Sequence, residues 1–370
     1  MSIKQNSDFL FGFEAVMTNP NGDPDQENKP RMDYETSTAL VSDARRKRDC
    51  REFLKQKNYR IFVDTLAEQK VPMDKMFDAI RNKWLGDQEQ FRSLLACTPD
   101  IGEKWKSLTG KDASECSNYK VAYQDIGEKA KSGDSEDKKK KKAEIKAALK
   151  DFNNTFLTAA IRKELIDVRL FGSAMAVEDI SRTYTGPIQI TWGYSLHPVE
   201  LVKSNTITSI MNEDSSTFGK KYKLHYAFIA HYGTINKYSA DLTGMTEADR
   251  MLFRQALVQG MMNNQTDSKQ GQTPLFYLEV VYKPEFDGYL GDLRRFLNVD
   301  KADIERPIRT LQDLRVNFNE LTQVIYKMKE KNLIDKIIGW FHPFTDKHVF
   351  LNIPSFEEVD LWVPVTTLEE

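Results

Sequence analysis

The sequence predicts an α+β fold, and three observations support this class. Short apolar segments typical of buried strands occur near both ends of the chain, and helices with clear start signals lie between them. A polar, lysine-rich segment separates the two sets of strands. Without that segment the expected order is βαββαβ, which is the ferredoxin-like order.

The first strand is predicted at residues 9–17, where apolar residues run almost without a break. It ends at 19–25, a cluster of asparagine, proline, glycine and aspartate that is typical of a turn. A helix is predicted at 42–57, with Ser42 as its N-cap. A second strand is expected at 59–64, so that residues 1–64 form the first part of the main domain.

Residues 65–166 are predicted to be a helical insertion. The segment is polar, and it contains a low-complexity stretch at 132–142 that ends in five consecutive lysines. Such a charge run is typical of a solvated surface.

Strand character returns at 167–175, 187–197 and 222–232, and a long link spans 198–221. The motif that begins at Thr246 predicts a capping box and a helix that ends near residue 262, before a last strand at 273–283. The main domain is therefore expected to resume at 167–300.

The C-terminal region, 301–370, is predicted to be a helix and a tail. One apolar stripe with spacings of three and four residues supports the helix, and it comprises Leu314, Phe318, Leu321, Ile325 and Met328.

The amino-acid composition limits the kinds of binding surface and cellular compartment that we expect for this protein. The 370 residues are 40% hydrophobic and 29% charged, and the net charge of -2 means that any surface for nucleic acid must concentrate its positive charge. The three cysteines lack the spacing of a metal site or a disulfide framework. Neither a signal peptide nor a membrane-spanning stretch is apparent, so we expect a cytoplasmic protein without membrane partners.

The turn after the first strand allows two interpretations. Asp23, Asp25, Glu27 and Asp33 carry hard oxygen ligands, so they could form an acidic metal site. The spacing does not fit an EF-hand, because Asn28 and Tyr34 stand where that motif requires glycine and glutamate. The alternative is a tight turn that is stabilised by asparagine and aspartate side chains.

Two basic segments are candidates for binding phosphate. Lys47, Arg48 and Arg51 share one face of the predicted helix, opposite Cys50 and Phe53. The alternative is an ordinary solvated helix face. In the loop 265–271, Ser268 and Lys269 could hydrogen-bond phosphate, although the loop could also be a simple connection.

The strand at 222–232 places aromatic residues on one face and two histidines on the other. Aromatic side chains on a sheet can stack nucleobases, but an apolar strand face is more often part of a core. His225 and His231 lie too far apart along a strand to bind one metal ion. Motifs for zinc, nucleotide or serine hydrolase chemistry are absent from the sequence.

Together these motifs resemble the crRNA-binding backbone subunits of CRISPR Cascade complexes, in the Csh/Csd branch of the RAMP superfamily and closest to type I-B. The matching segments run in order along the chain: 19–25, 30–33, 35–36, 40–43, 167–172, 186–189, 192–193, 195–197, 242–247, 268–269, 271–272 and 291–293.

The resemblance implies a palm with the fold of an RNA-recognition motif, a helical fingers insertion, and a thumb hairpin at about 198–221. A subunit of this kind binds the crRNA guide and polymerises with further copies of itself along the spacer, next to other Cascade subunits. It contacts target DNA through the guide, which pairs with the target. The resemblance implies neither catalysis nor a cofactor. The implied RNA-binding residues are Asn21, Arg31, Lys47, Arg48, Arg51, Arg169, Ser268 and Lys269, and the implied thumb wedge is Ile207, Ile210 and Met211.

The sequence departs from this family pattern at three positions. Arg46 stands where the family has an apolar residue, Asp49 where it has lysine, and Asp267 where it usually has arginine. Two other functions remain open. One is a metal-dependent endoribonuclease of the type III backbone kind that uses Asp33 or Asp23, and the other is a protein scaffold with an incidental basic helix.

Overall fold

The computed structural model describes residues 1–62, 73–129, 136–177, 180–212, 215–343, 345 and 355–368. The chain divides into two compact units. The first comprises Met1–Tyr59, Arg169–Phe171 and Gly186–Glu370, and the second comprises Arg60–Val168 and Gly172–Thr185. Within the described residues, no helix has both the length and the apolar character needed to cross a bilayer.

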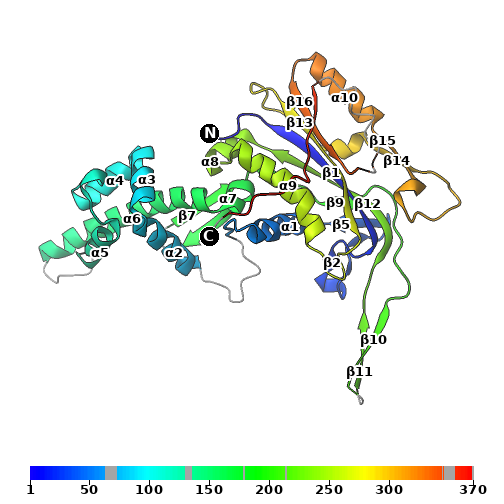
Figure 1. The fold of residues 1–370 in the computed structure, drawn as a ribbon, viewed down its shortest axis with the longest axis horizontal. Helices are drawn as coiled ribbons and strands as arrows, with labels where there is room; N and C mark the ends of the chain where they lie inside the picture. The colour runs from blue at the N-terminus through cyan, green and yellow to red at the C-terminus, as the bar shows by residue number, and fades with distance from the viewer. Residues whose placement is uncertain are drawn as a thin grey trace. The chain divides into compact units, whose positions relative to one another are not determined.

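The first unit is built on a mixed sheet with the strand order β17-β16-β13-β1-β12-β9-β5-β4, in which β8 also pairs with β12 (Figure 1). The central strand β1 is antiparallel to both β12 and β13. The bounds are β1 Ser7–Thr18, β4 Met32–Asp33, β5 Thr38–Val41, β8 Ile188–Ile190, β9 Gly193–Ser195, β12 Leu224–Ile235, β13 Gln272–Tyr282, β16 Ile334–Phe341 and β17 Phe356–Glu358.

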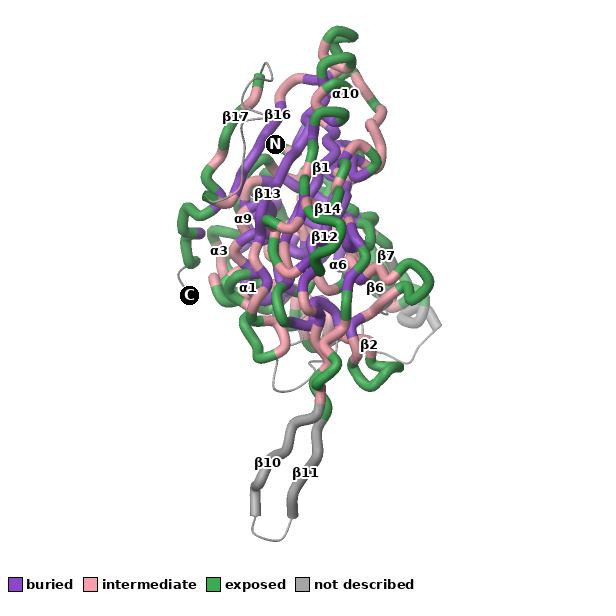
Figure 2. The backbone as a smooth tube through the Cα atoms, turned by 90° about the vertical axis from the view of Figure 1, so that its right-hand side faces the viewer, coloured by how far each residue is buried: buried purple, intermediate pink, exposed green. Residues whose placement is uncertain are grey.

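Both faces of this sheet are covered, which explains why β1, β12 and β13 are buried along almost their whole length (Figure 2). On one face, helices α1 (Asp43–Gln56) and α9 (Glu247–Asn263) pack against each other. A Cβ atom at Gly260 would lie 2.8 Å from the Asp49 carbonyl, so only glycine permits this close approach. Helix α8 (Lys237–Thr243) precedes α9.

On the other face, helix α10 (Asn319–Glu330) buries Leu321 and Ile325 against β13 and β16. Short elements complete the first unit, and their bounds are β2 Gly22–Asp23, η1 Pro24–Gln26, β3 Lys29–Pro30, η3 Leu293–Phe296, β14 Asn298–Lys301, η4 Leu311–Asp313 and β15 Leu314–Asn317. The α+β class predicted from the sequence is confirmed.

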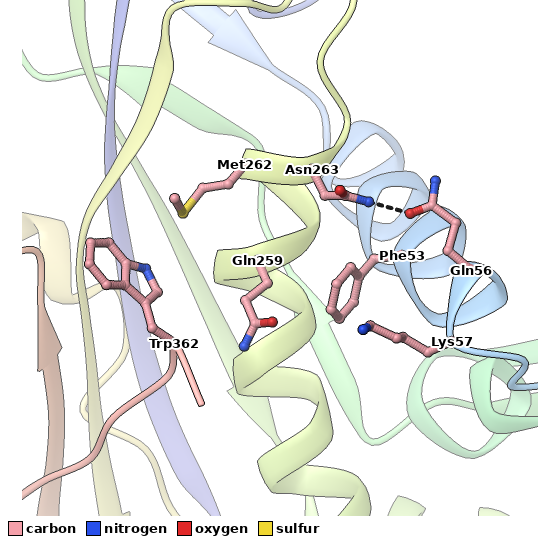
Figure 3. A pocket seen from close by; sticks show the side chains of 7 residues that line it. All are labelled: Phe53, Gln56, Lys57, Gln259, Met262, Asn263 and Trp362. Atoms are coloured by element: carbon pink, nitrogen blue, oxygen red, sulfur yellow. Dashed lines mark hydrogen bonds between the residues drawn. The ribbon is translucent and has the colours of Figure 1, made fainter. Parts of the chain in front are cut away.

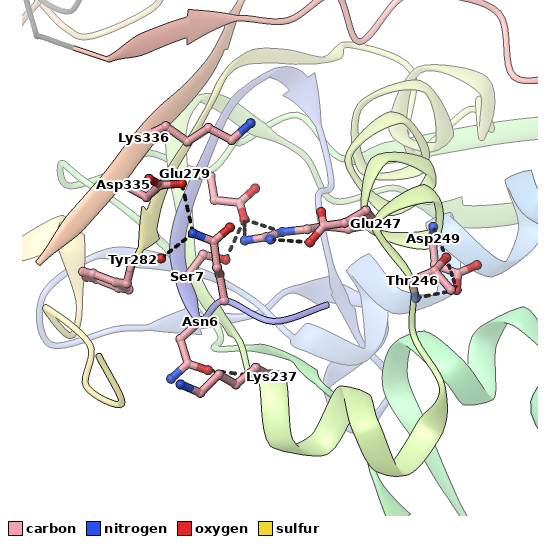
Figure 4. Close-up of polar contacts among 12 residues, drawn as sticks. Asn6, Ser7, Lys237, Thr246, Glu247, Asp249, Glu279, Tyr282, Asp335 and Lys336 are labelled. Atoms are coloured by element: carbon pink, nitrogen blue, oxygen red, sulfur yellow. Dashed lines mark hydrogen bonds and ion pairs between the residues drawn. The ribbon is translucent and has the colours of Figure 1, made fainter. Parts of the chain in front are cut away.

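The α9 face also contains a buried charged cluster, shown in Figure 4. Glu279 on β13 is fully buried, and it accepts hydrogen bonds from Ser7, Arg250 and Arg254 at 2.6 to 2.9 Å. The capping box predicted at the start of α9 is confirmed, because Thr246 and Asp249 satisfy each other's backbone amides.

The second unit is mainly helical. Its core contains the aromatic rings of Phe91, Trp105, Tyr119 and Phe152. The bounds are α2 Met73–Gly86, α3 Gln88–Cys97, α4 Pro99–Thr109, η2 Ala113–Glu115, α5 Tyr119–Lys129, α6 Glu136–Glu164 and the hairpin β6 Gly172–Val177 with β7 Ile180–Thr185. Helix α7 (Ile166–Phe171) has residues in both units.

Several predicted elements are wrong. Residues 59–62 do not form a strand. The single strand predicted at 187–197 is broken into β8 and β9, which both pair with β12. The strand predicted at 167–175 begins only at Gly172, because 166–171 is helical. The C-terminal helix begins after Phe318. It is followed in the chain by strand β16, which joins the main sheet and was not part of the predicted helix and tail.

The link predicted at 198–221 contains a two-stranded ribbon, β10 (Thr206–Asn212) with β11 (Ser215–Lys220) (Figure 1). The three predicted wedge residues, Ile207, Ile210 and Met211, are on β10, and their side chains lie outside the described part of the structure.

Candidate nucleic-acid interface

The end of β1 and the loop after α9 lie against each other, although they are 250 residues apart in the chain. The Ser268 carbonyl accepts hydrogen bonds from the Asn19 amide at 3.0 Å and from Thr18 Oγ1 at 2.6 Å. Lys269 Nζ donates to the Asn19 carbonyl at 2.6 Å. Gly271 closes the loop with φ 101°, and a Cβ atom there would lie 2.3 Å from the Val16 carbonyl.

The predicted RNA-binding residue Asn21 acts inside the fold. It is nearly buried, and its Oδ1 accepts hydrogen bonds from the Ser42 amide at 2.9 Å and the Ser42 hydroxyl at 3.0 Å. Ser42 is the N-cap of α1, as predicted, and accepts from the Arg45 amide at 3.3 Å. Asn21 is therefore a positioning residue that joins the turn to the first turn of the basic helix.

Helix α1 has the predicted polar and apolar faces, with Cys50 and Phe53 buried. On the polar side, Lys47 pairs with Asp43 at 2.9 Å and Arg48 with Glu52 at 2.5 Å. These pairs link neighbouring turns of one helix, and ion pairs at this spacing contribute little to helix stability. A phosphate group could therefore replace the carboxylates at small cost.

Beside this face lies a cationic cluster, which we define as Arg45, Arg46, Arg48 and Lys269, so that Arg48 belongs to both. Arg46 is only 1% exposed and stacks on the Phe13 ring at 5.0 Å. Asp49 pairs with Arg45 at 2.6 Å and with Arg46 at 3.0 Å. Within the described residues, none of the three guanidinium nitrogens of Arg46 makes a hydrogen bond.

The cluster changes the chemistry of Lys269. Burial and the nearby charges of Arg45, Arg46 and Arg48 lower its pKa to about 7, and Asp49 opposes this shift only in part. An anion beside the amine would favour its charged form. Lys269 is therefore placed where phosphate binding and proton uptake are coupled.

A second basic group, absent from the prediction, lies where the β11 strand returns to the sheet. Lys220, Lys221 and Lys223 line a cavity of about 170 Å³ together with Tyr222 and Ser268. Two carboxylates face these lysines: Asp267 pairs with Lys221 at 2.7 Å, and Glu27 accepts from Tyr222 at 2.7 Å. The sequence signal was the Lys-Lys-Tyr-Lys run at 220–223.

The other three predicted arginines have different surroundings. The Arg51 guanidinium lies 5.2 Å from the centre of the Phe171 ring. Arg31 is half-buried, pairs with Asp23 at 3.4 Å, and lies 5.8 Å from the centre of the exposed Trp192 ring. Arg169 forms a two-pronged ion pair with Asp249, at 3.0 and 3.1 Å. That pair fixes the start of α9, so an RNA-binding role for Arg169 remains a prediction.

The acidic turn is organised by hydrogen bonds of its own. Asp23 accepts from the Asp25 amide at 3.2 Å, and Asp33 accepts from the Glu35 amide at 3.0 Å and the Thr36 hydroxyl at 2.7 Å. These bonds lower the pKa of Asp33. Among the described residues, no group of three or more metal-ligating side chains occurs.

The aromatic residues predicted on the strand at 222–232 belong to the core, since Tyr226 and Phe228 are 1% exposed. His231 is also buried. Burial and the nearby Arg46 charge lower its pKa to about 3, so it is neutral.

A larger cavity of about 610 Å³ lies between α1, α9 and the C-terminal tail (Figure 3). Among the described residues its lining is Phe53, Gln56, Lys57, Gln259, Met262, Asn263 and Trp362, in which Lys57 is the one charged group. This lining contains no pair of acid and base groups for catalysis.

Comparisons with a protein-family model, with characterised proteins and with solved structures show what this chain is similar to. The family model for CRISPR-associated protein Cas7 matches residues 5–319. The chain belongs to the Cas7 family. A CRISPR-associated protein Cas7 from Haloferax volcanii is 22% identical over 354 residues, which cover 90% of this chain and 86% of that protein. The match to the family model includes α1, the turn, the loop and the lysines at 220–223.

Two solved structures are similar to this Cas7-family chain. A chain of a CRISPR RNA-guided surveillance complex, pre-nicking, has a TM-score of 0.50 and 14% identity over 96% of this chain and 97% of that one. A chain of another CRISPR RNA-guided surveillance complex has a TM-score of 0.46 and 12% identity over 96% and 95%. The first likeness supports the mixed α+β fold.

Proposed function

We propose that this protein is a non-catalytic crRNA-binding backbone subunit of a type I CRISPR Cascade complex. The first unit is the palm, with the fold of an RNA-recognition motif. Its neighbouring strands β13, β1, β12 and β8 correspond, in this order, to the four strands of that motif. The second unit is the fingers, and β10–β11 is the thumb. Copies of the chain bind side by side along the guide, next to other Cascade subunits in the cytoplasm.

The cationic cluster, together with the exposed basic face of α1, carries this proposal. Burying the positive charges of this cluster costs free energy unless an anion lies near them, and the phosphates of a bound RNA would supply that anion. The flanking lysines at 220, 221 and 223 extend the positive surface from the loop to the root of the thumb. Contacts to phosphate are independent of base sequence, so the guide remains free to pair with target DNA.

The assignment of no enzymatic activity is part of the proposal. Asp23 and Asp33, the residues considered for an endoribonuclease, are used in turn hydrogen bonds and in the Arg31 ion pair. Two-metal phosphodiester chemistry requires several ligands around the metal ions. RNA recovered with the protein in magnesium-containing buffer is therefore expected to stay intact.

The test measures RNA affinity against salt concentration. In the K47A/R48A/R51A variant, up to three phosphate contacts are lost, and each should reduce the slope of log K against log salt by about 0.7 for a single strand. The matched control is R306A/K327A/K331A, which removes three exposed cations from the α10 side of the same unit.

An unchanged slope in the α1 variant would favour the scaffold function over the proposed one. A parallel loss in the control would show that overall charge, and not this face, governs binding. Sedimentation of the wild-type chain with a spacer-length RNA should in addition give several copies per RNA.

A further inference from the structure

Trp192 is exposed although the backbone that carries it is held firmly. It lies in the break between β8 and β9, and its side chain is 45% exposed. Single exposed apolar residues are common and carry no message by themselves. The surroundings of this one distinguish it.

Three sets of contacts fix its backbone. Thr191 donates from its amide and its hydroxyl to the Tyr232 carbonyl at 2.8 and 2.9 Å. The nearly buried Arg294 donates from Nη1 to the Trp192 carbonyl at 2.7 Å and lies 4.1 Å from the centre of the Tyr194 ring. A Cβ atom at Gly193 would lie 2.6 Å from the His231 ring.

The ring itself has a cationic neighbour. The Arg31 guanidinium lies 5.8 Å from the ring centre, within the range of a cation–π contact. By contrast Trp362, the other half-exposed tryptophan of this unit among the described residues, packs against the rings of Trp340 and His342.

The strand register places the Trp192 backbone near the start of the basic helix. Gly193 pairs with Val41, and Val41 directly precedes Ser42, the N-cap of α1. Adjacent strands lie about 4.8 Å apart, so the Trp192 backbone is close to the first turn of α1. A nucleotide with its phosphate on that turn could place its base on the ring.

We propose that Trp192, together with Arg31, is a stacking platform for one nucleobase of the bound RNA. Aromatic rings and guanidinium planes are the groups on which proteins stack unpaired bases, and stacking tolerates any base. The site would hold one nucleotide per subunit in a fixed orientation. The inference rests on the proposed RNA-binding function.

The test compares two ligands of equal length and charge, an oligouridine RNA and the same ribose-phosphate chain without bases. For W192A we expect about tenfold weaker binding to the RNA, which is about 1.4 kcal/mol, and unchanged binding to the abasic chain. W192F should recover most of the loss. W362A is the matched control and should bind both ligands as the wild type does.

The outcomes separate the two proposals. Equal losses on both ligands, or no loss on either, overturn the stacking platform but leave RNA binding standing. If W192A changes only the assembly of copies in sedimentation, the ring contacts a neighbouring protein and the proposal is overturned. Failure of the wild type to bind either ligand overturns the proposed function, and the platform with it.

Discussion

Two charged clusters lie on the face of the sheet that α1 and α9 cover, and they differ in how their charges are balanced. Around Glu279, two arginines face a carboxylate whose oxygens also accept from Ser7 and Tyr277. In the cationic cluster, Asp49 faces Arg45 and Arg46, and the half-buried Lys269 adds a further basic group.

The pKa values express this difference. Burial alone would raise the pKa of Glu279, but Arg250 and Arg254 outweigh it, and the pKa falls far below its usual value. At Lys269, burial and the neighbouring arginines act in the same direction and lower the pKa to about 7. The first cluster supplies its own counterions, whereas the proposed function has an anion from outside complete the second. We infer that the first is structural and the second functional.

The strongest way to break this comparison is to remove the carboxylate of the balanced cluster. In E279Q, Arg254 remains buried without its carboxylate partner and Arg250 keeps only the exposed Glu247, so we expect a loss of about 3 to 5 kcal/mol in the free energy of unfolding. Urea titration followed by circular dichroism measures it. In the control E247Q, which removes only the exposed partner of Arg250, the change should stay below about 1 kcal/mol. If E279Q unfolded like the control, the cluster would not be structural.

A second prediction concerns pH and the cationic cluster. Free Lys269 has a pKa of about 7, and a bound phosphate should raise it, so binding takes up a proton between the two values. RNA affinity should therefore fall as pH rises above 7, by up to about tenfold per pH unit. Fluorescence anisotropy with labelled RNA at pH 6.5, 7.5 and 8.5 measures this.

The matched variant is K269R, because arginine keeps its charge over this range. It should bind with little dependence on pH. The same pH dependence in K269R and in the wild type would assign the titration to another group, and the contrast between the two clusters would lose its main support.

The sequence alone was sufficient for the parts that have local signals. The strand at 9–17, the turn after it, and helices α1 and α9 with their caps follow from apolar runs, turn residues and capping motifs. The sequence did not predict that β16 joins the main sheet, because an apolar segment near the C-terminus does not determine which strand it pairs with. A strand was predicted at 59–64 on the same kind of local pattern, but residues 59–62 form none, and tertiary pairing places β8 and β9 beside β12.

The candidate site shows the same limit. Lys47, Arg48 and Arg51 were identified because a helical face has a period in the sequence. Arg46 and Asp49 depart from the family pattern individually, but they pair with each other at 3.0 Å, so the two departures compensate. That pairing, and the contact of Lys269 with the turn, depend on distances between segments that no local pattern encodes.

The third departure, Asp267, allows the finest test of the comparison, with the smallest expected effect. Its carboxylate pairs with Lys221 at 2.7 Å, and both side chains are largely exposed. We expect it to compete with phosphate for this lysine, so D267N should bind RNA about two- to threefold more tightly at low salt. The slope of log K against log salt should become steeper by up to about 0.7, because one more phosphate contact becomes available.

The control is D303N, which removes an exposed carboxylate paired with Arg306 at 3.4 Å. It changes the net charge by the same amount, so a general electrostatic effect would appear equally in both variants. A larger gain in D267N would place the lysines at 220–223 on the RNA path and extend the functional cluster to the root of the thumb. Equal gains would confine that cluster to α1 and Lys269, where Arg46 is buried and Arg45 and Lys269 are half-buried.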